Sequence, residues 1–128
     1  MATVLVVDDI AANRELIVTL LAYQGHETIE AADGAEALTL VRAQRPALVI
    51  SDILMPTMDG YELLRQLRSD PDLRNTPVIF YTAYPVFPSG TDDPDVVGYM
   101  SKAVDRADLY ALLPPAIRRS RERRGGDS

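Results

Sequence analysis

The fold can be read outward from residues 47–60, Ala-Leu-Val-Ile-Ser-Asp-Ile-Leu-Met-Pro-Thr-Met-Asp-Gly. Residues 47–50 form an apolar run that is too short for a helix and rich in branched side chains, which is typical of a buried strand. The run leads to a carboxylate, Asp52, after which Pro56 and Asp59-Gly60 indicate a turn. In an open α/β sheet, ligands bind beyond the carboxyl ends of the strands. We therefore predict that Asp52 lies at the functional edge of a parallel sheet.

Strand-like and helix-like patterns alternate along the rest of the chain. Four further apolar runs predict strands at residues 3–7, 26–32, 77–82 and 96–101. Leucines and other apolar residues at helical spacing predict helices at residues 10–23, 35–44 and 61–68, and a last helix marked by Leu109, Leu112 and Leu113. This alternation predicts βα units, a parallel sheet and a three-layer sandwich in one domain.

Three segments interrupt the pattern. Residues 84–98 contain Pro85, Pro88, Gly90 and Pro94, so the helix that the alternation requires there is expected to be absent or very short, in a mobile loop. Pro114-Pro115 is expected to kink or split the last helix. Residues 69–75 are predicted to be a polar linker.

The composition excludes several classes of protein. The 128 residues include no cysteine, which excludes disulfides and thiolate metal sites, and only one histidine, His26, which excludes a multi-histidine zinc site. We interpret His26 as structural and without a partner. No apolar run approaches the roughly 20 residues of a membrane helix, so we expect a cytoplasmic protein without a membrane partner.

Charge is distributed unevenly along the chain. Residues 1–117 carry 8 basic and 17 acidic side chains, which is evidence against direct binding of nucleic acid by the main body. Residues 118–124 carry five arginines and one glutamate. We interpret residues 118–128 as the solvated end of the last helix and a linker, with a weak site for an anionic partner as the alternative.

Polar side chains follow the predicted strands at one edge of the sheet: Asp8-Asp9, Asp52, Thr82 and Lys102, the only lysine. Each has an ordinary structural explanation when taken alone, such as helix capping for Asp8-Asp9 or a solvated surface position for Lys102. Taken together, clustered carboxylates require a counter-ion, and an oxygen-rich site suits Mg²⁺. An ammonium and a hydroxyl nearby are suited to a bound phosphoryl group.

The set of motifs resembles the response-regulator receiver domain of two-component signalling. It consists of Val-Asp-Asp at residues 7–9, Asp-Ile-Leu-Met-Pro-x-Met-Asp-Gly at residues 52–60, Thr82-Ala, and Tyr99-x-x-Lys102, and it covers residues 3 to about 117. The resemblance implies a flavodoxin-like, doubly wound sheet of five parallel strands in the order 2-1-3-4-5, with residues 1–117 as the receiver domain. Its members are regulatory phosphoproteins of a phosphorelay, not enzymes with a separate substrate.

The resemblance also implies a role for each matching residue. Asp52 would accept a phosphoryl group from a histidine kinase or phosphotransfer protein. Mg²⁺ would be bound by Asp9, Asp52 and the main-chain oxygen of Leu54, and through water by Asp8. Lys102 would contact the phosphoryl oxygens, and Thr82 and Tyr99 would form the conformational switch.

Three residues affect how closely the chain follows that pattern. Ala103 stands where receiver domains usually have a proline in a cis peptide after the lysine. Leu54 and Tyr84 lie two residues beyond Asp52 and Thr82, where the family's side chains tend to control water attack on the phosphate. Both are bulky and neither carries a base that orients water, so we expect a slowly hydrolysing phospho-aspartate.

Other functions stay open at this point. A degenerate receiver would bind proteins without being phosphorylated, and the chain could be the receiver portion of a hybrid histidine kinase. An aspartate-nucleophile phosphohydrolase would need a second acid two residues after the nucleophile, where Leu54 stands. We also expect that the chain does not dimerise through the usual face of the fourth and fifth helices, because residues 84–98 are poor in helix-forming residues.

Overall fold

The fold alternates strands and helices from the first residues onward. The computed structural model describes residues 2–53, 55–82, 96–101, 110–111 and 113–114. Its elements, in chain order, are β1 (Thr3–Val7), α1 (Ala11–Tyr23), β2 (Glu27–Ala31), α2 (Gly34–Gln44), β3 (Leu48–Asp52), α3 (Gly60–Ser69), β4 (Val78–Thr82) and β5 (Val96–Ser101). The bounds agree with the predicted ranges to within two residues.

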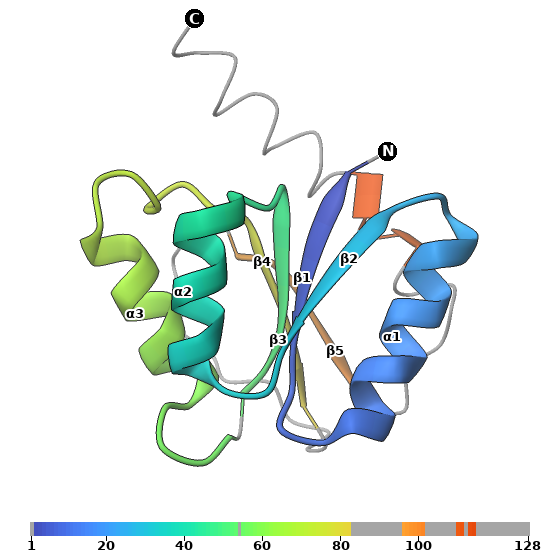
Figure 1. Ribbon diagram of the computed structural model, residues 1–128, viewed down its shortest axis with the longest axis horizontal. Coiled ribbons are helices and arrows are strands. Elements are labelled where there is room, and N and C mark those ends of the chain that lie inside the picture. The colour runs from blue at the N-terminus through green and yellow to red at the C-terminus, as the bar shows by residue number, and fades with distance from the viewer. Residues whose placement is uncertain (1, 54, 83–95, 102–109, 112, 115–128) are drawn as a thin grey trace, which may run out of the picture.

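The five strands form one parallel sheet in the order β2-β1-β3-β4-β5 (Figure 1). This confirms the predicted doubly wound arrangement, in which β3 is the central strand. In the register, Val7 of β1 pairs with Ser51 of β3, and Asp52 pairs with Tyr81 of β4. The carboxyl ends of β1 and β3 therefore lie side by side, and β4 ends next to them.

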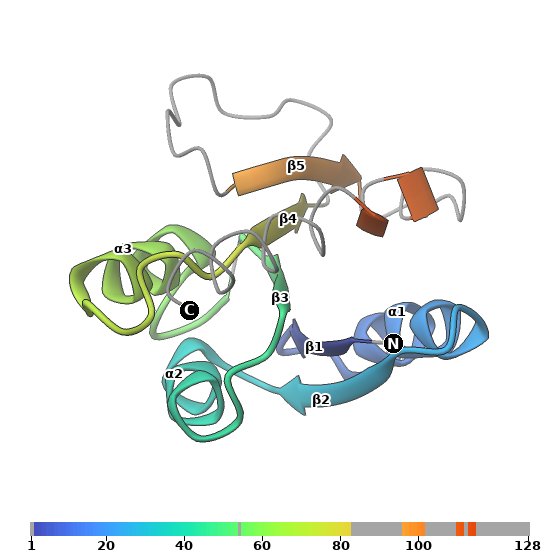
Figure 2. The same cartoon turned by 90° about the horizontal axis from the view of Figure 1, so that it is seen from above.

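Helices cover both faces of the sheet, which gives three layers (Figure 2). One core cluster lies between the sheet and α2 and α3, and it includes Leu5, Val49 and Phe80. The other lies between the sheet and α1, and it includes Val6, Ile50, Tyr81 and Leu113. Successive residues of a strand alternate between the two clusters, because side chains along a strand project to opposite faces. Burial on both faces explains why the central strands are continuous apolar runs.

The helices begin and end at the residues that cap them. Asp33 and Asp59 are the N-caps of α2 and α3, and each carboxylate accepts a 2.8 Å hydrogen bond from the backbone N–H three residues later. After α1, Gly25 adopts a φ of 80°, the left-handed conformation that commonly ends a helix. These turns return the chain to the sheet and set where the next strand starts.

The structure corrects three details of the sequence interpretation. His26 has a partner, because its Nδ1 accepts a 3.1 Å hydrogen bond from the backbone N–H of Ala2. Burial, followed by the positive charge of the N-terminus, lowers the pKa of His26. The segment 69–75 is not simply polar, because Leu73 is buried in the core against α2 and α3. Residues 96–98 were predicted both in the strand at 96–101 and in the loop at 84–98, and they belong to the strand, β5.

Other expectations fall outside the described residues. These concern the missing fourth helix and the rest of the loop at 84–95, the peptide between Lys102 and Ala103, and the arginine-rich residues 118–128. Within the described part, residues 110–111 and 113–114 are helical, and the Tyr110 hydroxyl donates a 3.2 Å hydrogen bond to the carbonyl of Leu20 in α1. The kink expected at Pro114-Pro115 is not covered, because Pro115 is not described. None of the described helices has the length and apolar character needed to cross a membrane.

The loop between β3 and α3 contains a strained residue. Thr57 has a φ of 71°, a left-handed conformation that is unfavourable for a β-branched side chain. Asparagine adopts this conformation more readily, so Thr57→Asn should raise the free energy of unfolding by about 1 kcal/mol. Urea denaturation would measure the change.

Thr19 supplies a matched control for that substitution. It is exposed on α1, in a helical backbone conformation that threonine and asparagine tolerate about equally. Thr19→Asn should leave stability within a few tenths of a kcal/mol of wild type. Equal effects of the two substitutions would contradict the assignment of strain to Thr57.

Candidate functional site

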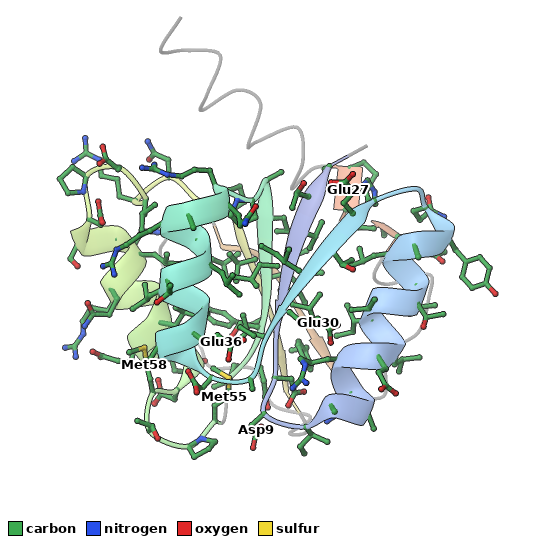
Figure 3. The ribbon with its side chains drawn as sticks, in the orientation of Figure 1. Asp9, Glu27, Glu30, Glu36, Met55 and Met58 are labelled. Carbon is green, nitrogen blue, oxygen red and sulfur yellow. The ribbon has the colours of Figure 1, made fainter. Side chains whose placement is uncertain are left out.

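Three carboxylates meet at the carboxyl ends of β1 and β3. Asp8 and Asp9 follow β1, and Asp52 is the last residue of β3. Each offers one oxygen, and these oxygens all lie within 4.8 Å of one another. Asp8 and Asp52 are buried, with exposed fractions of 0% and 1%, while Asp9 is exposed. Figure 3 places Asp9 at the lower edge of the sheet, opposite the end where Glu27 begins β2. The predicted gathering of acids at one edge is therefore present.

The carboxylate of Asp8 is held by two donors from different parts of the chain. The backbone N–H of Ile10 donates to Oδ1 at 2.9 Å, and the hydroxyl of Tyr81 donates to Oδ2 at 2.6 Å. Helix capping does not explain Asp8-Asp9, because the N-cap of α1 is Ile10 and it makes no side-chain capping bond. The two hydrogen bonds instead compensate for the burial of an acid beside two others.

The Tyr81 hydroxyl is surrounded by negative charge. Its side chain is buried, and desolvation raises the pKa of Tyr81 strongly above its usual value. The hydrogen bond to Asp8 and the charges of Asp8 and Asp52 raise this pKa further. Tyr81 therefore keeps its proton at physiological pH and acts as a neutral hydrogen-bond donor in the acid cluster.

Arg14 supports the same corner from α1. Its Nη1 donates a 2.6 Å hydrogen bond to the main-chain oxygen of Asp8, and its Nε lies 3.2 Å from the carboxylate of Glu30 in β2. The guanidinium thus ties the end of β1 to α1 and to the edge strand. The contact fixes the main chain of Asp8, whereas Ile10 and Tyr81 bind its carboxylate.

The main chain around Asp52 is closely packed. The Ser51 hydroxyl donates a 2.9 Å hydrogen bond to the carbonyl of Asp52, and the Ile53 N–H donates to the carbonyl of Tyr81 at 3.2 Å. The Gly60 N–H donates to the carbonyl of Ile53 at 2.7 Å. A Cβ atom at Gly60 would lie 2.5 Å from the Asp52 oxygen, so only glycine fits at this approach of α3 to the end of β3.

The donor set fits a divalent cation of the Mg²⁺ type. Carboxylate oxygens are the hard ligands that Mg²⁺ prefers, and it is commonly bound through one or two of them with several waters. Asp8, Asp9 and Asp52 supply such oxygens at one place. An exposed Asp9 beside two buried acids also leaves the cluster open to solvent on one side. The three side chains could therefore hold the cation.

The structure describes the other predicted site residues only in part. Thr82 ends β4, and Tyr99 of β5 pairs with Phe80, but the side chains of both lie outside what is described. Leu54 and Lys102 lie outside the described residues altogether, as does Tyr84. The structure thus brings together Asp8, Asp9 and Asp52, and the position predicted for the Lys102 ammonium lies outside the described residues.

Sequence reasoning missed Tyr81 and Arg14. Tyr81 belongs to an apolar strand, where an aromatic side chain normally indicates core packing. The presence of a phenol directly before Thr82, at the strand end nearest the predicted acids, was the available signal. Arg14 lies one helical turn into α1 and carried no signal of its own.

Comparison with known proteins gives a consistent result. The Response regulator receiver domain family matches residues 4–114. Response regulator MprA of Mycobacterium sp. (strain KMS) is 36% identical over 132 residues, which cover 98% of this chain and 54% of MprA. The chain spans between 25% and 54% of the length of the first curated relatives that it matches.

Solved structures with the same fold include two receiver proteins. Chemotaxis protein CheY4 of Vibrio cholerae has a TM-score of 0.79 and 31% identity, and the match covers 91% of this chain and 98% of CheY4. The signal receiver domain of a signal transduction histidine kinase from Syntrophus aciditrophicus has a TM-score of 0.77 and 32% identity, with 91% and 90% of the two chains covered.

The close approach of Gly60 to Asp52 can be tested by substitution. Gly60→Ala would place a methyl group against the backbone of Asp52 and Ile53, which cannot move without displacing the end of β3. We expect a loss of about 1–3 kcal/mol in the free energy of unfolding, as in overpacked cores, although alanine favours helices more than glycine does.

Gly34 provides the comparison, because it also begins a helix and a Cβ there would meet only side-chain atoms of Met58. Gly34→Ala should lower the free energy of unfolding by less than Gly60→Ala does, since the methionine side chain can adjust. Denaturation curves of the two variants would measure the difference. A Gly60→Ala protein as stable as wild type would contradict the tight packing behind Asp52.

Proposed function

The chain belongs to the response regulator receiver domain family, and from this premise we propose that it accepts a phosphoryl group on Asp52. Receiver domains are regulatory signalling modules of two-component systems, and their partners are histidine kinases or phosphotransfer proteins. The observation that carries the proposal is the position of Asp52, buried at the end of the central strand with Asp8 and Asp9 beside it. The degenerate receiver is disfavoured because all three acids are present and gathered.

Each of the three acids has a distinct part in the proposed reaction. A carboxylate oxygen of Asp52 forms a bond to phosphorus as the phosphorus–nitrogen bond of the donor imidazole breaks, and the electron pair stays on that nitrogen. Asp9 and Asp52, with the main-chain oxygen of Leu54, would hold Mg²⁺, and Asp8 would hold its waters. The ion, when bound, spreads the negative charge of the transferring group. Lys102 would supply the remaining positive charge to the phosphoryl oxygens.

Phosphorylation would then bias a two-state element. A phosphoryl group adds negative charge and acceptor oxygens where a carboxylate stood. The Thr82 hydroxyl would donate to these oxygens, and Tyr99 would turn inward behind it. Thr82 and Tyr99 belong to neighbouring strands, β4 and β5, which supports coupling between them. Slow hydrolysis, because of Leu54 and Tyr84, would keep the active state populated.

The domain boundaries and the wider setting also belong to the proposal. We assign residues 1–117 to the receiver domain and residues 118–128 to an arginine-rich segment beyond it. The family match ends at residue 114, and the curated relatives extend well beyond the length of this chain. These facts support a receiver that works with further domains or partners. A cytoplasmic location and the absence of direct nucleic-acid binding stay predictions.

The acceptor role predicts a covalent modification that depends on one residue. After incubation with Mg²⁺ and a small phosphodonor such as acetyl phosphate, intact mass spectrometry should show a gain of about 80 Da in the wild type. Asp52→Asn, which keeps the size of the side chain, should show none. The isosteric Asp33→Asn, which changes a carboxylate at the N-cap of α2, serves as the control and should still gain mass. A wild type that never gains mass, or an Asp52→Asn protein that does, would refute the assignment.

The surface beside the acids predicts where the phosphoryl donor binds. α1 starts at Ala11, two residues after Asp9, and its exposed face includes Leu16, which is 46% exposed. Exposed apolar side chains next to a reactive group are typical of a protein-binding surface. Leu16→Gln should slow transfer from a phosphorylated kinase domain about fivefold, which corresponds to about 1 kcal/mol of lost apolar contact.

Transfer from a small phosphodonor should not change in the Leu16 variant, because no partner surface is involved. Tyr23→Gln is the matched control, since Tyr23 is exposed at the other end of α1. It should leave both rates unchanged. Equal slowing with both donors would mean that Leu16 acts on the site itself and not on docking.

A further inference from the structure

Tyr81 reaches from one strand to the acid of another that is not its neighbour. β3 lies between β4 and β1 in the sheet, yet the Tyr81 hydroxyl lies 2.6 Å from Asp8 Oδ2 at the end of β1. The ring crosses the end of β3 within the core cluster that contains Val6 and Ile50. A buried phenol therefore bridges the two strands on either side of Asp52.

The bridge fixes the direction of the Asp8 carboxylate. With Ile10 on Oδ1 and Tyr81 on Oδ2, both oxygens are tied, and rotation about the Cβ–Cγ bond would break both hydrogen bonds. A carboxylate oxygen has two lone-pair positions and can accept more than one hydrogen bond. The bonds from Ile10 and Tyr81 therefore orient the carboxylate.

We propose that Tyr81 is a positioning residue that holds Asp8 for a hydrated divalent cation and makes the site favour Mg²⁺ over Ca²⁺. The inference rests on the proposed function of the acid cluster and adds a determinant of its metal preference. Tyr81 touches neither the cation nor the phosphoryl group in this scheme; it acts through Asp8.

The preference follows from the different demands of the two ions. Mg²⁺ requires near-ideal octahedral geometry and keeps several waters, whereas Ca²⁺ accepts six to eight ligands in flexible arrangements. A fixed second-layer carboxylate orients the waters of the smaller ion. Loss of such outer partners typically weakens metal binding tenfold or more. An Asp8 carboxylate that is less firmly oriented, without the bond from Tyr81, would thus weaken Mg²⁺ binding more than Ca²⁺ binding.

Tyr81→Phe isolates this role, because it removes the hydroxyl and keeps the ring. The main chain of Asp8 stays anchored by Arg14, so the variant alters the carboxylate alone. Isothermal titration calorimetry with Mg²⁺ and with Ca²⁺ should show about a tenfold weaker Mg²⁺ affinity and less than a twofold change for Ca²⁺. Tyr81→Met, a second variant without a donor, should show the same shift and serves if the first fails to fold.

Tyr61→Phe is the matched control. Tyr61 packs edge-on against Phe80 and belongs to the cluster on the opposite face of the sheet, so its substitution should leave both affinities unchanged. A double-mutant cycle tests the route: in an Asp8→Asn background, Tyr81→Phe should have no further effect on Mg²⁺ affinity.

The outcomes separate this inference from the proposed function. Wild type that binds neither ion refutes the metal site itself. If the wild type binds Mg²⁺, two results for Tyr81→Phe would overturn the positioning role alone. One is an unchanged or increased Mg²⁺ affinity, and the other is an equal loss of affinity for Mg²⁺ and Ca²⁺. An effect of Tyr81→Phe that persists in the Asp8→Asn background overturns the route through Asp8.

Discussion

The repulsion between three carboxylates at one sheet edge is the constraint on which the rest of the site depends. Asp8 and Asp52 are almost completely buried, and their oxygens lie within 4.8 Å of each other and of Asp9. Buried like charges are costly unless hydrogen bonds or a counter-ion compensate for them. The chain supplies the hydrogen bonds to Asp8 from Ile10 and Tyr81. In the proposed function a bound cation would compensate further for this repulsion, so the gathering of the acids would favour binding of the ion.

Keeping the acids together requires a rigid frame around Asp52. A parallel sheet with both faces buried provides it, because the ends of β1, β3 and β4 cannot shift independently. The start of α3 then approaches so closely that Gly60 has no room for a side chain. The loop before it includes Thr57 in a left-handed conformation. Strain of this kind persists at functional sites where the surrounding structure determines the geometry.

Most of the fold could be predicted from the sequence because its signals are local. The apolar runs that became β1 and β3, and the turn residues Asp33 and Asp59 that became helix caps, depend on neighbours within a few positions. The meeting of Asp8, Asp9 and Asp52 followed from the rule that parallel strands end at one edge. The contact between Tyr81 and Asp8 spans 73 positions and two strand spacings, and no local pattern carries it. The same holds for His26 with Ala2 and for the burial of Leu73, which depend on how distant segments pack.

The chemical nature of the group beside Asp8 explains why a tyrosine suits this position better than a basic residue. An arginine or lysine there would compensate for the buried charge more strongly, but its own positive charge would repel an incoming divalent cation. Tyr81 is neutral, and the burial and negative charge that raise its pKa ensure that it stays so. It can therefore stabilise the carboxylate without cancelling the negative potential of the cluster. Arg14, the nearest described cation with a contact to Asp8, binds the main-chain oxygen and pairs its charge with Glu30. Among the described residues, the charge of Arg14 is thus directed at the backbone and at β2, so it does not bind the carboxylates to which the proposed function assigns the metal.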